Sequence, residues 1–247
     1  MSRIHPSDQS RCHGHLLFRN HRGGRKRPLH DHDDDHKHRD QVAASSVMLT
    51  VWKRSSMSFQ GTDGFTVFDP RGTLVFRVDN YSRKNGCGLV LMDGVGNALL
   101  SLKPKILSMQ YQWRAYRGDQ DGRCEKANVF FMRSPSVLSN FQAAGRKHVA
   151  EIFMGTHSGG HHDQSMPDLK IEGSFRSRDC KIVKTCTGEV VARISRKRVV
   201  MNNTTILLSD DVFSLVVHPG FDTHLIMAFV IVLDRISCKP FSPFLCS

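Results

Sequence analysis

One stretch decides the fold of this chain: Phe221-Asp-Thr-His-Leu-Ile-Met-Ala-Phe-Val-Ile-Val-Leu-Asp-Arg-Ile236. Its central part, Leu225–Leu233, consists of nine consecutive apolar residues. Asp222 precedes them and is a favourable N-cap, because its carboxylate can accept hydrogen bonds from the unpaired amides of a first helical turn. A helix that is apolar on every side must be buried on every side. The stretch therefore predicts a helix that the rest of the protein encloses.

Two alternatives to a buried helix are a membrane span and a buried strand. A span needs about 20 apolar residues to cross roughly 30 Å of hydrocarbon, whereas this run is shorter and is closely flanked by Asp222, His224, Asp234 and Arg235. The β-branched residues Val230–Val232 favour a strand. The run nevertheless exceeds the usual strand length of about five or six residues, and its length and cap together favour the helix.

The chain before this helix has the pattern of short strands separated by turns. Leu74, Phe76 and Val78 alternate with residues of the opposite face, which is the period of two that is typical of a strand. Turn sequences such as Asp69-Pro-Arg-Gly72 and Asp93-Gly-Val-Gly-Asn97 separate the apolar runs. The predicted strands are Met48–Lys53, Phe65–Phe68, Thr73–Tyr81, Leu89–Met92, Ala98–Lys103, Tyr111–Arg117, Asn128–Arg133, Val149–Met154, Leu169–Phe175, Asp179–Thr185, Glu189–Arg196, Ile206–Leu208 and Val212–Val217.

These elements predict a mainly β fold, a closed antiparallel barrel of about twelve strands around a buried C-terminal hydrophobic helix. No helix-length pattern separates the strands, so βαβ units are excluded. A helix with its side chains is about 10 Å across, and large barrels can enclose a central helix. Closure also removes the sheet edges that otherwise invite aggregation.

The segments outside residues 48–236 differ in composition from this domain. Residues 1–47 form a His/Arg-rich tail that holds eight of the fourteen histidines and few long apolar residues, so we expect it to be disordered. The run His30–His38 is interpreted as solvated polypeptide, with a weak Zn²⁺ or Ni²⁺ site as the alternative. Arg25-Lys26-Arg27 could serve as a nuclear address or contact nucleic acid. Residues 237–247 form a short C-terminal tail.

Composition and charge narrow the compartment and the partners. The chain of 247 residues carries a net charge of +12, which favours anionic partners such as nucleic acid or acidic lipid headgroups. Its seven cysteines are odd in number and show no C-x-x-C pair, and the N-terminus lacks the apolar segment of a signal peptide. We therefore expect an intracellular protein of the cytoplasm, the nucleus or the inner membrane surface.

Several motifs of the domain resemble those of the plant LURP-one-related family. They are Trp52-Lys-Arg-Ser-Ser56, Gly64-Phe-Thr-Val-Phe-Asp69, Gly72-Thr-Leu-Val-Phe-Arg-Val-Asp-Asn-Tyr81, Leu91-Met-Asp-Gly-Val-Gly96, Pro219-Gly-Phe-Asp222 and Val232-Leu-Asp234. The resemblance covers about residues 48–236. It implies a tubby-like barrel, shared with phospholipid scramblases, and it brings no catalytic residues, cofactor or metal. It also implies a relation to membrane-tethered transcription regulators and, for some members, to plant defence.

The first functional hypothesis is a non-enzymatic module that binds anionic phospholipid headgroups. The resemblance supports it, because tubby-like domains bind phosphoinositides through surface lysines and arginines. Basic residues near an anionic leaflet gain roughly 1 kcal/mol each. For each single residue, a solvated strand face kept basic for solubility is the alternative. The candidate headgroup-binding residues are Lys103, Lys105, Arg114, Arg117, Arg193, Arg196, Lys197 and Arg198.

Two other classes of function have weaker support from the sequence. Nucleic-acid binding would use the same positive charge, but the chain has no zinc finger, helix-turn-helix or aromatic RNA-binding motif. An enzyme or scramblase would need a nucleophile motif, which Cys87, Cys124 and Ser158 lack, or a carboxylate cluster with a membrane segment. The polar loop Gly155–Pro167 contains His157, His161 and His162 and is interpreted as a mobile surface loop rather than a metal site.

Overall fold

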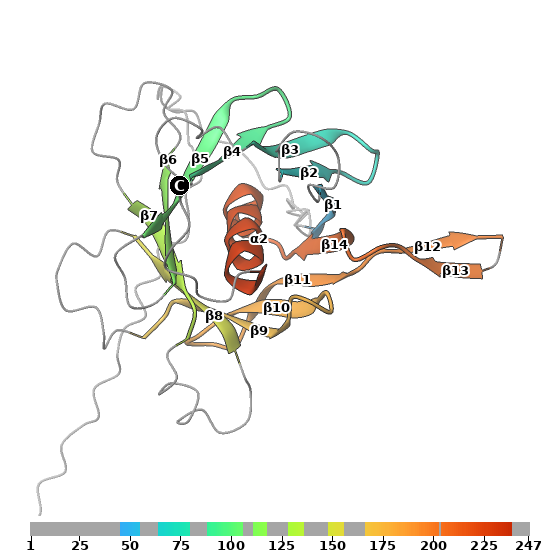
Figure 1. Ribbon diagram of the computed structural model, residues 1–247. Helices are drawn as coiled ribbons and strands as arrows, with labels where there is room; N and C mark the ends of the chain where they lie inside the picture. The colour runs from blue at the N-terminus through green and yellow to red at the C-terminus, as the bar shows by residue number, and fades with distance from the viewer. Residues whose placement is uncertain are drawn as a thin grey trace, which may run out of the picture.

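The computed structural model describes residues 45–54, 64–79, 88–105, 111–117, 128–135, 148–155, 166–202 and 204–238. Twelve antiparallel strands close into a barrel in the order β1-β14-β11-β10-β9-β8-β7-β6-β5-β4-β3-β2 (Figure 1). The strands are β1 (Val47–Arg54), β2 (Gly64–Phe68), β3 (Leu74–Asp79), β4 (Leu89–Asp93), β5 (Ala98–Lys105), β6 (Gln112–Arg117), β7 (Asn128–Arg133), β8 (His148–Met154), β9 (Leu169–Ser174), β10 (Asp179–Lys184), β11 (Val190–Arg196) and β14 (Val212–Val217). The predicted barrel is therefore confirmed.

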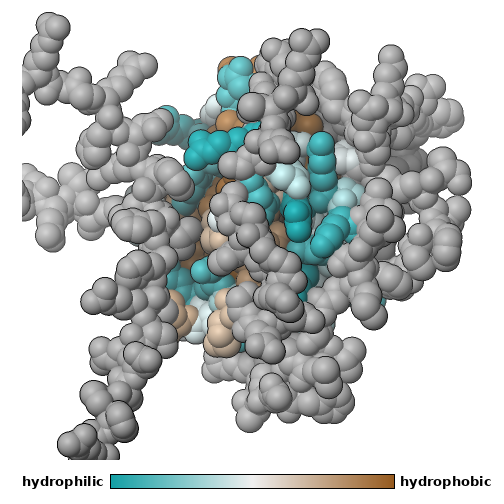
Figure 2. Space-filling view, turned by 90° about the vertical axis from the view of Figure 1, so that its left-hand side faces the viewer, coloured by the Kyte–Doolittle hydropathy of each residue, from teal (hydrophilic) through white to brown (hydrophobic). Residues whose placement is uncertain are grey.

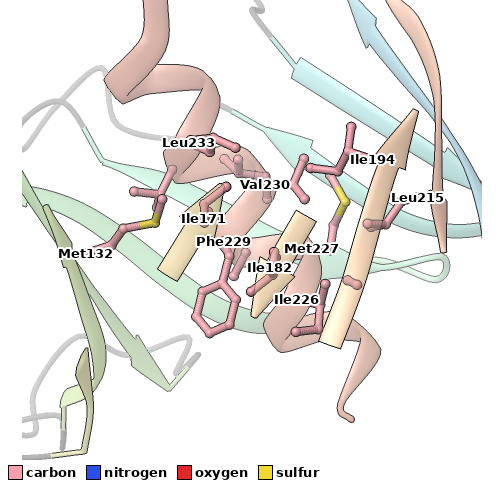
Figure 3. Packing of buried hydrophobic residues seen from close by; sticks show 14 of the residues in the cluster. Met132, Ile171, Ile182, Ile194, Leu215, Ile226, Met227, Phe229, Val230 and Leu233 are labelled. Atoms are coloured by element: carbon pink, nitrogen blue, oxygen red, sulfur yellow. The ribbon is translucent and has the colours of Figure 1, made fainter. Parts of the chain in front are cut away.

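Helix α2 (Thr223–Cys238) occupies the inside of this barrel, as the sequence predicts. Every residue from Ile226 to Leu233 is buried. The ring of Phe229 meets that of Phe130 edge to face, with centroids 4.7 Å apart. Figure 3 shows helix side chains packed among those of the surrounding strands, including Met132, Ile171, Ile182, Ile194 and Leu215. Each large side chain buried in this way contributes about 1.5–3 kcal/mol, so the helix and the barrel wall stabilise each other.

The start of α2 has the predicted cap. Oδ1 of Asp222 accepts a hydrogen bond from the amide of His224 at 3.0 Å, and the carbonyl of Asp222 accepts one from the amide of Ile226 at 3.0 Å. Near the other end, Asp234 is buried and forms an ion pair with Lys53 of β1. The helix is therefore fixed to the barrel by polar contacts at both ends as well as by its apolar surface.

Two predicted turns are also confirmed, because an aspartate carboxylate organises each one. Oδ1 of Asp69 accepts hydrogen bonds from the amides of Arg71 and Thr73. Oδ1 of Asp93 accepts three, from the amides of Val95, Gly96 and Asn97. The pKa of the Asp93 carboxyl is lowered, chiefly by the side-chain hydrogen bond from Asn97. These turns connect β2 to β3 and β4 to β5.

One predicted strand is misplaced. Residues 204–207 do form a strand, β13 (Thr204–Leu207), but it pairs only with β12 (Arg198–Met201) in a separate two-stranded ribbon. The prediction that Ile206–Leu208 belongs to the barrel is therefore wrong, and β12 was not predicted. The physical reason is that an apolar run indicates a strand without showing which surface covers it. Figure 1 shows the ribbon standing out from the barrel between β11 and β14.

Candidate anion-binding surfaces

The eight predicted headgroup residues lie on two opposite walls of the barrel. Lys103, Lys105, Arg114 and Arg117 are on β5 and β6, and we name them the β5–β6 cluster. Arg193, Arg196, Lys197 and Arg198 lie between the second half of β11 and the start of β12, and we name them the β11–β12 cluster. Four strands separate β11 from β6 in one direction around the barrel and five separate it from β5 in the other. The structure thus divides one predicted set into two surfaces that face away from each other (Figure 1).

In the β5–β6 cluster, Lys103 and Arg114 are direct cross-strand partners. Their neighbours Leu102 and Ala115 point into the core, so the two basic side chains share the outer face. Neither Lys103 nor Arg114 has an ion pair among the residues that the structure describes, and the Nε of Arg114 is buried without a hydrogen-bond partner there. Like charges directly opposite each other destabilise a sheet, so these two cations repel each other.

The other two members of this cluster are placed differently. Lys105 is exposed near the end of β5, opposite Gln112. Arg117 is also exposed but pairs with Leu100, whose side chain is buried in the core. It therefore does not continue the outward row of Lys103 and Arg114. The outward pair is the compact part of the β5–β6 cluster.

Beside this pair lies a polar and aromatic network that sequence reasoning missed. Phe131 of β7 lies opposite Arg114 of β6 on one side and opposite Phe153 of β8 on the other. The rings of Phe131 and Phe153 stack with their centroids 4.4 Å apart. The guanidinium of Arg133 lies 4.8 Å from the Phe153 centroid, and its Nε lies 3.0 Å from Oε2 of Glu151. Figure 2 faces this side of the barrel and shows hydrophilic residues next to hydrophobic ones. Arg133 is thus already neutralised, unlike Lys103.

The carboxylate of Glu151 has a second partner in this network. Its Oε1 lies 3.0 Å from the Nε2 of His148, and both side chains are buried. The β-bulge between His148 and Ala150 brings the imidazole to the outer side of β8, where Glu151 also lies. A bulge has no simple signal in a single sequence, which is why the predicted strand began only at Val149.

In the β11–β12 cluster, only Arg196 has an ion pair among the described residues. Its guanidinium lies 2.9 Å from Oδ1 of Asp210 and donates a hydrogen bond to the carbonyl of Ser177 at 3.3 Å. Arg193 and Arg198 are exposed and Lys197 is partly buried. None of these three side chains forms an ion pair with another described residue. They therefore supply most of the uncompensated positive charge of this cluster.

The wall next to the β11–β12 cluster is partly apolar. Trp52 of β1 lies opposite Val212, the first residue of β14, which directly follows the ribbon. Its side chain points outward, since Val51 beside it is buried in the core, and it is 50% exposed. Met48 is also exposed on this wall, in the same row as Arg193 and Val216. Basic and apolar side chains therefore share this side of the barrel.

The described residues contain no group of three or more His, Cys, Asp or Glu side chains that could hold a metal ion. The predicted loop His157, His161 and His162 lies outside the described residues, as do His30–His38 and Arg25–Arg27. The candidate nucleophiles Cys87, Cys124 and Ser158 lie outside them too. In the part of the chain that is described, no helix has the length and apolarity that crossing a membrane requires.

Comparison with known proteins places this barrel in a family. The model of the LURP-one-related family matches residues 47–234, which includes every strand of the barrel and most of the enclosed helix. The chain belongs to the LURP-one-related family. Protein LURP-one-related 5 of Arabidopsis thaliana is 40% identical over 192 residues, which cover 76% of this chain and 82% of that relative.

Two further relatives agree with this assignment, and one solved structure shares the fold. Proteins LURP-one-related 17 and 8 of Arabidopsis thaliana are 33% and 35% identical, covering 78% and 77% of this chain and 85% and 87% of their own lengths. An X-ray structure of a protein from Arabidopsis thaliana shares the fold, with a TM-score of 0.52 and 20% identity over 78% of this chain and 93% of that one. The LURP-one-related barrel is thus established as the scaffold on which the two basic surfaces lie.

Proposed function

We propose that this LURP-one-related barrel is a non-enzymatic module that binds anionic phospholipid headgroups, such as those of phosphoinositides, through the β11–β12 cluster. One observation carries the proposal. Lys197 and Arg198 bring two positive charges without a described counter-charge to the root of a ribbon that stands out from the barrel, and Arg193 adds a third further back on β11, opposite Val216.

The expected strength of this interaction follows from the charges. Each basic side chain near an anionic leaflet contributes roughly 1 kcal/mol, so three contribute about 3 kcal/mol, or a roughly hundredfold gain in partitioning. Arg196 is held by Asp210 and contributes less directly. The guanidinium groups of Arg193 and Arg198 suit bidentate contacts to phosphate oxygens.

The non-enzymatic part of the proposal rests on the sequence, in which Cys87, Cys124 and Ser158 lack the motifs of known nucleophiles. A regulatory role at a membrane also fits the relation to membrane-tethered transcription regulators, and to defence, that the family resemblance implies. The inner membrane surface is then the proposed site of action.

Vesicle sedimentation of the full chain tests the proposal. The vesicles contain phosphatidylcholine alone, with phosphatidylserine, or with a phosphoinositide. The test variant is K197E/R198E, and K103E/R114E on the opposite wall is the matched control, because both change the net charge by the same amount. We expect the test variant to bind anionic vesicles at least tenfold more weakly and the control to bind like the wild type.

Two results would contradict this assignment. If only K103E/R114E loses binding, the headgroup site is the β5–β6 cluster, and the β11–β12 assignment is wrong. The wild type could instead bind no anionic vesicles but bind duplex DNA near physiological salt, with an affinity that falls steeply as the salt concentration rises. In that case the nucleic-acid hypothesis replaces the lipid one.

A further inference from the structure

The ribbon β12–β13 exposes large apolar side chains on both of its faces. In its register Val199 pairs with Ile206, and Val200 pairs with Thr205. Because side chains alternate along a strand, Val199, Ile206 and Met201 share one face while Val200 and Leu207 lie on the other. The exposed fractions are 39% for Val199, 72% for Val200, 61% for Met201, 44% for Ile206 and 45% for Leu207. These are five of the eight residues of the two strands.

This concentration differs from the scattered single apolar residues that occur on every protein surface. A flat protein partner would cover one face of the ribbon and leave the other in water. A fluid apolar medium covers both faces at once. Two-faced exposure therefore favours a lipid interface over a flat docking partner.

The charges around the ribbon fit an anionic surface. From Lys197 to Ser209 the chain contains no acidic residue. Lys197 and Arg198 stand where the ribbon leaves the barrel. The turn that returns to β14 carries Asp210 and Asp211, and Asp210 is paired with Arg196 at 2.9 Å. The ribbon thus carries cations at its root and apolar side chains along its middle, which match the adjoining phosphate and acyl regions of a membrane, whereas Asn202 and Thr204 lie at its far end.

Trp52 provides an independent observation at the same place. It is half exposed, and its strand partner Val212 is separated from the end of β13 by only a few residues. Tryptophan is enriched at membrane–water interfaces, where its indole ring meets both apolar and polar surroundings. The second tryptophan of the chain, Trp113, is buried in the core.

We infer that the β12–β13 ribbon inserts into the interfacial layer of an anionic membrane, with Trp52, Lys197 and Arg198 at the headgroup level. The inference rests on the proposed function and specifies how the β11–β12 cluster is anchored. A strand of four residues is about 13 Å long at roughly 3.3 Å per residue, so the ribbon reaches the boundary of the acyl chains but does not cross about 30 Å of hydrocarbon. The unpaired outer edges of a two-stranded ribbon and the polar residues Asn202 and Thr204 at its far end require that it lie along the interface rather than point its tip into the acyl chains.

The test compares V200S/M201S with the conservative control V200I/M201L, both in the full chain, on vesicles that contain phosphatidylserine or a phosphoinositide. One substituted residue lies on each face of the ribbon and neither is in the core, so both variants should unfold at the temperature of the wild type. We expect V200S/M201S to bind about tenfold more weakly and V200I/M201L to bind normally. Trp52 fluorescence of the wild type should shift to the blue and be quenched by lipids labelled near the headgroup, and W52F should lose this signal.

The outcomes separate the two proposals. If V200S/M201S binds like the wild type and Trp52 is not quenched, the ribbon does not insert, while headgroup binding stands as long as K197E/R198E is impaired. If K197E/R198E also binds normally, headgroup binding through this cluster fails as well. If the wild type dimerises without lipid and V200S/M201S does not, the ribbon is an interface between two copies of the chain, and the insertion is wrong.

Discussion

The ammonium group of Lys53 on β1 lies 2.9 Å from Oδ1 of Asp234 on α2, and the two residues are 181 positions apart in the chain. The side chain of Asp234 is only 2% exposed, whereas that of Lys53 is 21% exposed. The contact connects the first strand of the barrel to the last turns of the enclosed helix. The carboxylate is therefore the member of the pair that depends more strongly on a compensating charge.

Replacing Lys53 by methionine should cost about 3 kcal/mol of the free energy of unfolding, because it removes a cation from a carboxylate that water hardly reaches. The measurement is urea denaturation at neutral pH. The control is K53M/D234N, in which the buried group is neutral, and it should lose less than K53M alone. Equal losses in the two variants would show that the charge of Asp234 is not what makes K53M costly.

The cap of α2 should make stability depend on acid pH. Burial raises the pKa of the Asp222 carboxyl. The hydrogen bonds that it accepts and the charge of His224 lower this pKa by more than burial raises it, so that it lies below its usual value of 3.8. Because the folded pKa is below the unfolded one, ionised Asp222 favours folding above this value, and its contribution is lost as the pH falls through the lowered pKa.

Thermal unfolding of D222A and D222N at neutral pH and near pH 3 tests this dependence. D222A should lose about 1 kcal/mol at neutral pH, as expected for a lost N-cap, and its deficit should shrink in acid. D222N keeps a capping oxygen that does not titrate, so its stability should vary less with pH than that of the wild type. A D222A deficit that stays constant down to pH 3 would contradict the assignment.

Cys180 and Cys186 should differ sharply in reactivity. Burial raises the pKa of the Cys180 thiol to about 12 and places it in the core, while Cys186 lies exposed in the turn after β10. Since the thiolate is the reactive form, alkylation at about pH 8 should modify Cys186 within minutes and Cys180 only after unfolding. Mass spectrometry of the digested protein reads each site separately, and equal labelling of both in the folded protein would refute the prediction.

The sequence was sufficient to predict the barrel because its C-terminal apolar run can be buried only inside a surrounding wall. The run Leu225–Leu233 has no polar side, so a surrounding wall was required, and the period-two pattern of the upstream segments supplied it. The cap at Asp222 and the turns at Asp69 and Asp93 were predictable because each uses contacts between residues close in the chain.

Features that depend on distant pairing could not be predicted. Nothing near Lys103 or Lys197 in the sequence shows that the two lie on opposite walls, since that follows from the order of twelve strands. The ion pair between Lys53 and Asp234 was also unpredictable, because it joins residues 181 positions apart in the chain. The ribbon is a separate case: the apolar residues Val199–Met201 and Ile206 indicate strands, but their composition does not show that these strands pair with each other outside the barrel.

The position of α2 after all the strands has a consequence for biosynthesis. A ribosome releases every segment of the wall before the segment that fills it, so the nascent barrel has no interior until residues 223–238 emerge. Until then the inward side chains have no helix to pack against, and exposed apolar surface of this kind makes folding intermediates prone to aggregate. Chains truncated before Thr223 should therefore be captured by chaperones or degraded, and translation beyond that point is what commits the protein to its native state.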